Sequence, residues 1–218
     1  MAKLPLPPAD LARDIGIRAE EFRRVTPETL LWRIHRIRGG HVTPWNQLRH
    51  YGPTDARFEP HPPPAGEHPD RAVWYAAATP RTALAEVFQR TRTVPLSDTY
   101  HLTAVRLTRT VRLLDLTGEP GYGAWATRAG ASMALSTGRH DYTSAWAREL
   151  CDQFPDLDGL AYRAAIEGGL AIALFLPAED AMPNQAVTSR ALSDPALASR
   201  IAGVCHTIGY RIVSPYRP

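Results

Sequence analysis

The sequence has few cysteines, no long apolar run and no apolar leader. Its two cysteines, Cys151 and Cys205, fall in segments with helical periodicity and form neither a metal-binding spacing nor a disulfide framework. We therefore expect two reduced thiols in a cytoplasmic protein. No stretch approaches the length of a membrane-spanning helix, and the first residues do not resemble a secretory signal, so we expect no membrane association.

The common nucleotide, metal and hydrolase motifs are also absent. The sequence contains no GxxxxGK[ST], no HExxH and no GxSxG, which argues against P-loop phosphoryl transfer, zinc hydrolysis and an α/β-hydrolase. Gly118, Gly121 and Gly123 lack the preceding strand and following helix of a dinucleotide fingerprint, so we expect them to form a turn. We expect no metal site.

Lysine is nearly absent, and the basic side chains are otherwise arginines. Lys3 is the only lysine, and the formal net charge is only +3. This charge, without any basic run, is too weak to predict direct binding to nucleic acid. The planar fork of arginine suits phosphates and carboxylates, which favours an anionic small ligand, although a bias in coding composition explains the arginines equally well.

Hydrophobic periodicity predicts one α+β domain over residues 1–218. We expect strands at 30–37, 73–77, 100–107, 111–116, 159–163, 170–176 and 210–213, and helices at 10–24, 80–90, 143–154 and 193–206. The absence of a regular βαβ repeat favours α+β over a doubly wound sheet. The core is expected at about 30–177, with an N-terminal helical addition and a C-terminal helix–strand addition. The long irregular segment 38–72 is typical of a functional or disordered loop.

Five polar side chains occupy positions that favour a ligand site. They are Arg33, in the middle of the strand at 30–37; Arg57, in the long loop; Tyr75, at the end of the next strand; Glu86, inside the following helix; and Ser144, at the expected start of the helix at 143–154.

The segments that carry these residues resemble the RES domain. They are, in order, LWRIH, ARFEP, VWYAAATPRTALAEVF, DYTSAWAREL, DGLAYRAA and GGLAIALF, and together they span roughly residues 30–177. The strongest single piece is YAAATPRTALAEVF. The family is named for an Arg, a Glu and a Ser.

The resemblance implies a fold, an activity and residue roles. The fold would be ADP-ribosyltransferase-like, with a mixed β core and flanking helices, and the activity would be degradation of NAD⁺. Arg33 and Arg57 would hold the dinucleotide and Tyr75 would line the nicotinamide pocket. Glu86 would be the central acid and Ser144 the family's serine, so that Glu86, Arg57 and Ser144 form the catalytic group.

The chemistry suits these residue types independently. Cleavage of the nicotinamide–ribose bond develops positive charge on the ribose, which a fixed carboxylate such as Glu86 stabilises. Arginines pair with pyrophosphate, and the face of Tyr75 can stack on the cationic nicotinamide ring. NAD⁺ is then a substrate, no cofactor is required, and the acceptor is inorganic phosphate as a co-substrate, water or a protein side chain.

Each of the five residues also has a purely structural interpretation. Arg33 could pair with a structural carboxylate, Arg57 could be solvated, Tyr75 could belong to the core, Glu86 could pair with Arg90 four residues on, and Ser144 could be a helix N-cap. The sequence departs from the family at Arg163, where many relatives carry a serine nearby, and at Asp55-Ala56, which replace a glycine pair. These departures leave the acceptor and the substrate range open.

Three functional hypotheses follow. The first is an NAD⁺ phosphorylase or glycohydrolase that acts as a toxin or defence effector. The second is an ADP-ribosyltransferase with a macromolecular target, and the third is a non-catalytic module that binds NAD, ADP-ribose or a partner protein. The resemblance also implies an Xre-like, DNA-binding antitoxin as partner, and it leaves open whether the chain forms a homo-oligomer.

Overall fold

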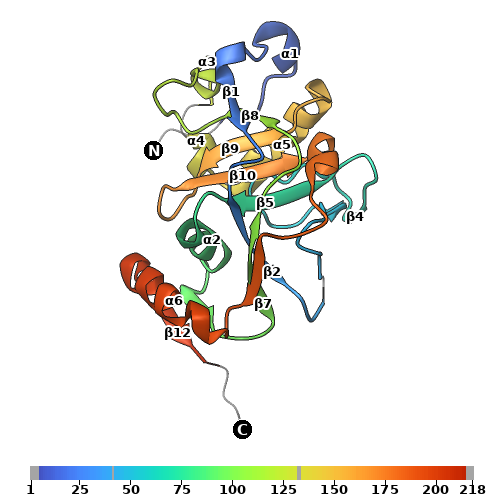
Figure 1. The fold of residues 1–218 in the computed structure, drawn as a ribbon. Helices are drawn as coiled ribbons and strands as arrows, with labels where there is room; N and C mark the ends of the chain where they lie inside the picture. Colours follow the sequence, from blue (N-terminus) through green and yellow to red (C-terminus); the bar gives the residue numbers. More distant parts are fainter. Residues whose placement is uncertain (1–4, 41, 132–133, 215–218) are drawn as a thin grey trace.

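The computed structural model describes residues 5–40, 42–131 and 134–214. Residues 1–4 and 215–218, the ends of the expected domain, lie outside this range. An eight-stranded sheet forms the centre of the fold, and helices flank it (Figure 1). Its strands pair antiparallel except β8 and β9, which are parallel. The predicted α+β class, with a mixed β core and flanking helices, is confirmed.

The elements have the following bounds. From one edge to the other, the main sheet contains β1 (Phe22–Val25), β8 (Val111–Asp115), β9 (Gly159–Arg163), β10 (Leu170–Phe175), β5 (Val73–Ala77), β2 (Leu31–Arg36), β7 (Tyr100–Val105) and β11 (Thr188–Ala191). Two small sheets pair β3 (Tyr51–Gly52) with β4 (Gly66–Glu67), and β6 (Thr93–Pro95) with β12 (Arg211–Val213). The α-helices are α1 (Leu11–Asp14), α2 (Pro80–Val87), α3 (Trp125–Arg128), α4 (Ala134–Thr137), α5 (His140–Gln153) and α6 (Pro195–Ile208), and the 3₁₀ helices are η1 (Ala19–Glu21) and η2 (Leu176–Ala181).

The main sheet parts between β2 and β5. These strands share one Cα pair, Trp32 with Ala77, whereas β5 stays in register with β10 from Val73 to Ala77. Beyond the shared pair the two strands diverge, and the ladder hydrogen bonds between them end. The gap gives side chains of β2 and β5 a common space inside an otherwise continuous sheet.

Helix α2 begins beside this gap, and local sequence signals determine where it starts. The Thr79 hydroxyl accepts a hydrogen bond from the Thr82 amide at 3.1 Å, and Pro80 occupies the first turn, as predicted. The stripe Ala83, Leu84 and Phe88 packs against α6, which lies beside α2 in the lower part of Figure 1. Glu86 lies off this stripe and is therefore free to face the gap.

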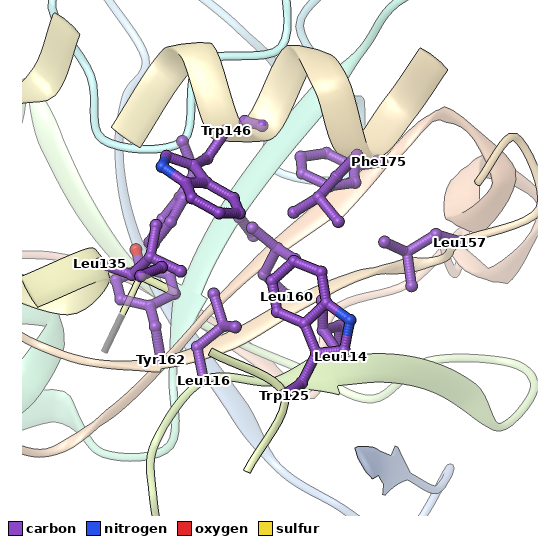
Figure 2. Packing of buried hydrophobic residues seen from close by; sticks show 14 of the residues in the cluster. Leu114, Leu116, Trp125, Leu135, Trp146, Leu157, Leu160, Tyr162 and Phe175 are labelled. Atoms are coloured by element: carbon purple, nitrogen blue, oxygen red, sulfur yellow. The ribbon is translucent and has the colours of Figure 1, made fainter. Parts of the chain in front are cut away.

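A large apolar cluster lies between α5 and strands β8, β9 and β10. Trp146 of α5 packs edge-on against Trp125, with ring centroids 5.9 Å apart. Figure 2 shows these rings together with Leu160 and Phe175 from the sheet. This buried cluster fixes α5 on the sheet. It includes Tyr162 of β9, at the left of Figure 2.

The predicted helix at 10–24 is wrong. Helix α1 ends at Asp14, Gly16 adopts a left-handed φ of +60°, and the Asp10 side chain makes no capping hydrogen bond. Residues Phe22–Val25 instead form β1, which pairs with β8. Pairing with a distant strand thus overrides a weak local helical pattern.

Helix α5 begins three residues earlier than predicted, at His140. Its N-cap position is Arg139, whose side chain makes no capping hydrogen bond. Ser144 therefore lies in the second turn, and its interpretation as an N-cap is wrong. Strands β3, β4, β6 and β11 were not predicted either, because each is short and none has a clear alternation of its own.

Both cysteines are free, as expected: Cys151 is half-buried in α5 and Cys205 is buried in α6. Among the described residues, the helices are all too short or too polar to span a membrane.

Gly159 of β9 leaves no room for a side chain against β10, and replacing it should destabilise the fold. Its φ is +152°, and a Cβ there would overlap the Ala173 carbonyl and lie 2.9 Å from the Leu174 Cα. We expect Gly159→Ala to lower the free energy of unfolding by about 3 kcal/mol in urea titrations. As a matched control, a Cβ at Gly203 in α6 meets nothing within 4 Å, so Gly203→Ala should stabilise by roughly 0.5–1 kcal/mol. Equal stability of the two variants would contradict this account of β9.

Candidate functional site

A cavity of about 200 Å³ lies in the gap between β2, β5 and α2. Its walls include Trp32, Arg33, Tyr75, Glu86, Val87 and Tyr162. The cavity is smaller than the usual pocket for a drug-sized ligand, so it suits one end of an extended ligand rather than a whole dinucleotide.

Arg33 crosses the gap without any acidic partner. Its Nη1 donates to the Tyr75 carbonyl at 3.3 Å, its guanidinium lies 5.3 Å from the Trp74 ring centroid, and its buried Nε has no hydrogen-bond partner. Burial lowers the pKa of Arg33 to about 10, which leaves it cationic at neutral pH. Within the described part of the chain no carboxylate forms an ion pair with it, so the interpretation of Arg33 as half of a structural ion pair is wrong.

Arg57 is half-buried beside the cavity rather than solvated. Its Nη1 donates to the Gly138 carbonyl at 2.7 Å. Among the described residues it too takes part in no ion pair. Its own carbonyl accepts the Tyr75 hydroxyl at 2.8 Å, so the two predicted residues fix each other.

Side chains on either side of Arg57 also hold the loop in place. Asp55 accepts hydrogen bonds from His140, at 2.8 Å, and from Arg90. Phe58 is fully buried with a left-handed φ of 56°, and its ring lies 4.8 Å from that of Tyr162. A bulky residue rarely adopts this conformation, and such strain is typical of functional sites.

Glu59 fixes the end of the same loop from inside the protein. Its carboxylate is fully buried and accepts hydrogen bonds from His61, Arg49 and Thr54. Burial alone would raise the pKa of Glu59, but the hydrogen bonds from His61 and Arg49 outweigh it and lower the pKa to about 2. The carboxylate therefore stays ionised and holds the loop that presents Arg57.

Glu86 reaches the cavity from α2 and is held by a backbone amide. One of its carboxylate oxygens accepts a hydrogen bond from the Ala165 amide at 3.1 Å. The alternative pairing with Arg90 is wrong, because Arg90 pairs with Asp55. Burial raises the pKa of Glu86, and the nearby charge of Arg57 opposes this shift in part. The site thus contains the Glu86 carboxylate, the nearby charge of Arg57 and the buried charge of Arg33, and no ion pair joins the three.

The two tyrosines of the cavity are neutral hydrogen-bonding and packing groups. Burial raises the pKa of both the Tyr75 and Tyr162 phenols. Tyr162 was not predicted as a site residue. It ends the apolar run of β9, and only the pairing of β9 with β10, and of β10 with β5, brings it to Glu86.

Ser144 does not line the cavity. It is buried, and its hydroxyl donates to the Ala56 carbonyl at 3.4 Å, so it supports the Arg57 loop from α5. The structure therefore brings Arg33, Tyr75 and Glu86 to one cavity, places Arg57 beside it and Ser144 behind the loop.

Arg163 forms an ion pair with Glu119 at 2.8 Å and donates to the Gly168 carbonyl. In the described part of the chain, no three His, Cys, Asp or Glu side chains gather as a group that could hold a metal ion.

Comparison with known proteins identifies a matching family and a similar fold. The family model described as RES domain matches residues 30–201. The fold is similar to that of a chain in the crystal structure of the M. tuberculosis MbcT–MbcA toxin–antitoxin complex, with a TM-score of 0.55 and 17% sequence identity, over 88% of this chain and 97% of that chain. No curated protein matches the sequence.

The unpaired charge of Arg33 predicts an unusual response to its removal. We expect Arg33→Met to fold at least as stably as wild type, because a buried charge without a counter-ion opposes folding. It should also lose most of the rise in melting temperature that inorganic pyrophosphate gives the wild type.

Arg128→Met is the matched control. Arg128 donates to the buried carboxylate of Glu21 at 2.6 and 2.8 Å, so its removal should cost about 3–5 kcal/mol in urea unfolding. Strong destabilisation by Arg33→Met would show that Arg33 is a structural residue, and an unchanged response to pyrophosphate would contradict its role in ligand binding.

Proposed function

The chain belongs to the RES domain family, and on this premise we propose that it is a toxin-type enzyme that cleaves the nicotinamide–ribose bond of NAD⁺. The observation that carries the proposal is the cavity between β2, β5 and α2, where Arg33 and Glu86 both line the walls, Arg57 lies nearby and no ion pair joins the three. NAD⁺ has the matching charges, a dianionic pyrophosphate and a cationic nicotinamide ring.

Binding is proposed to place each end of the substrate against its complement. The guanidinium groups of Arg33 and Arg57 bind the pyrophosphate through charge-assisted hydrogen bonds. The nicotinamide ring enters the cavity against Tyr75, whose aromatic face attracts the cation. The ribose between them then lies next to Glu86.

Bond cleavage is proposed to depend on Glu86. The electron pair of the C1′–N bond leaves with nicotinamide, which becomes neutral, while the ribose acquires oxocarbenium character. The carboxylate of Glu86 stabilises this charge more in the transition state than in the bound substrate. Water then adds at C1′ and releases a proton to give ADP-ribose, or phosphate adds to give phosphorylated ADP-ribose. Because nicotinamide leaves as a neutral molecule, the proposal requires no cofactor.

A partner protein is proposed to cover the cavity. A solved structure with a similar fold is a toxin–antitoxin complex, and the family resemblance suggests an Xre-like, DNA-binding antitoxin. The free positive charge of Arg33 and Arg57 favours a partner segment that brings a carboxylate to the cavity.

The products formed from NAD⁺ test the proposal. Purified protein is incubated with NAD⁺, with and without inorganic phosphate, and the products are resolved by mass spectrometry. We expect nicotinamide together with phosphorylated ADP-ribose or ADP-ribose. Intact NAD⁺ under both conditions would refute cleavage of free NAD⁺ and favour ADP-ribosylation of a macromolecule or a binding module.

Replacement of Glu86 separates catalysis from binding. We expect Glu86→Gln to lower kcat by about 100-fold or more, because the amide cannot stabilise the oxocarbenium charge. NAD⁺ binding, measured by calorimetry, should persist because both arginines remain. Glu179→Gln is the matched control: Glu179 is an exposed glutamate paired with His50, away from the cavity, and its loss should leave kcat unchanged. Full activity of Glu86→Gln would contradict the mechanism.

The raised pKa of Glu86 predicts loss of activity in mild acid. Since the ionised carboxylate is the active form, kcat/KM should fall as the pH drops through the pKa of Glu86, which burial raises above the ordinary value of 4.5. Arg57 lowers this pKa, so Arg57→Met should move the acidic limb to higher pH as well as weaken binding. A pH–rate profile with its acidic limb at or below 4.5, or a limb that Arg57→Met moves to lower pH, would exclude Glu86 as the group that titrates.

A further inference from the structure

A second glutamate, Glu167, lies behind Glu86 in the turn between β9 and β10. The turn spans residues 164–169 and closes with hydrogen bonds from the Ala164 amide to the Gly169 carbonyl and from the Gly168 amide to the Ala164 carbonyl. Although it is a surface turn, the Glu167 side chain is only 8% exposed. A glutamate this deeply buried in a turn requires partners.

The partners of Glu167 are both on the first turn of α2. One carboxylate oxygen accepts the hydroxyl of Thr82, and the other pairs with the Arg81 Nε at 2.8 Å. The neighbouring Gly169 makes this contact possible, since a Cβ there would overlap both Glu167 and the Thr82 hydroxyl. Three side chains thus join the turn to the helix that carries Glu86.

The same turn also supplies the hydrogen bond that holds Glu86. The Ala165 amide, two residues before Glu167, donates to the Glu86 carboxylate at 3.1 Å. Glu86 and Thr82 are four residues apart on α2 and lie on one face of the helix. The turn therefore contacts α2 at two positions: the Glu167 carboxylate binds the Thr82 hydroxyl, and the Ala165 amide binds the Glu86 carboxylate.

We propose that Glu167 is a positioning residue that fixes the β9–β10 turn to α2 and so holds the Glu86 carboxylate in the cavity. This inference rests on the proposed role of Glu86 in NAD⁺ cleavage. Glu167 touches no reacting atom. Its effect reaches the substrate through the Ala165 amide and through the repulsion between two neighbouring carboxylates.

Electrostatics gives this role a measurable signature. The groups that face Glu86 are Arg57 from the loop, His140 from α5, Tyr162 from β9, Glu167 from the turn and Tyr210 after α6. After burial, which raises the pKa of Glu86 most, the charge of Glu167 raises it and the Ala165 amide lowers it. Removing only the charge of Glu167 should therefore lower the pKa of Glu86, while the other charged groups stay in place.

Two substitutions separate the effect of the Glu167 charge from the effect of its contacts with α2. Glu167→Gln keeps an acceptor for Thr82 and loses the charge, so the pKa of Glu86 should fall below the wild-type value, with kcat within about threefold of wild type. Glu167→Ala loses both contacts, so kcat should fall at least about tenfold, while KM stays near wild type because Arg33 and Arg57 are untouched. Thr82→Val removes the same contact from the helix side and should also lower kcat.

The experiment titrates the Glu86 carboxyl by ¹³C NMR in wild type, Glu167→Gln and the control Glu179→Gln, and measures kcat and KM for wild type, Glu167→Ala and Thr82→Val. A lower pKa in Glu167→Gln alone, with a selective loss of kcat in the other two variants, is the expected result. An unchanged Glu86 titration in Glu167→Gln, or an unchanged kcat in Glu167→Ala, would overturn the proposal. Absence of NAD⁺ turnover in wild type would instead refute the proposed function, and the NMR titration would still decide the placement of Glu167.

Discussion

Strands β2 and β5 share a single Cα pair, and the whole site depends on their separation beyond it. Where two strands part, backbone groups lose their ladder partners, and a buried polar group must find another partner. Here the Arg33 guanidinium crosses the gap and donates to the Tyr75 carbonyl. The same separation gives Glu86 of α2 a cavity to face and leaves Tyr75 accessible from one side. An unbroken β2–β5 ladder would leave no space for these groups.

Charges of both signs therefore meet at the cavity without neutralising one another. Burial opposes the charge of Arg33 and that of Glu86, as the directions of their pKa shifts show. Fixed charges of this kind reduce stability, and they favour binding of a ligand that carries their complements in the same order. The arrangement differs from the structural ion pairs elsewhere in the chain, such as Arg128 with Glu21, in which each charge is already neutralised. The charges of the cavity differ from these ion pairs in that they remain available to a ligand.

The sequence predicts those parts of the site whose signals are local. Strand β5 and the start of α2 are predicted correctly because Thr79 and Pro80 mark the helix start, although the helix ends at Val87 and not at residue 90. Strand β1 is missed because its partner, β8, is distant in the sequence. Ser144 is misplaced because Arg139, at the true start of α5, gives no capping signal. The contributions of Tyr162 and of the turn after β9 depend on pairings among three strands, which periodicity alone does not reveal.

The central claim is that the unpaired charges of the cavity are complementary to NAD⁺, and a crystal structure of Glu86→Gln with bound NAD⁺ tests it most directly. We expect the pyrophosphate to lie within hydrogen-bond distance of Arg33 and Arg57, the nicotinamide ring against Tyr75, and the ribose C1′ next to the side chain at position 86. NAD⁺ bound elsewhere on the protein, or bound with Arg33 still on the Tyr75 carbonyl and no contact to the pyrophosphate, would contradict the account.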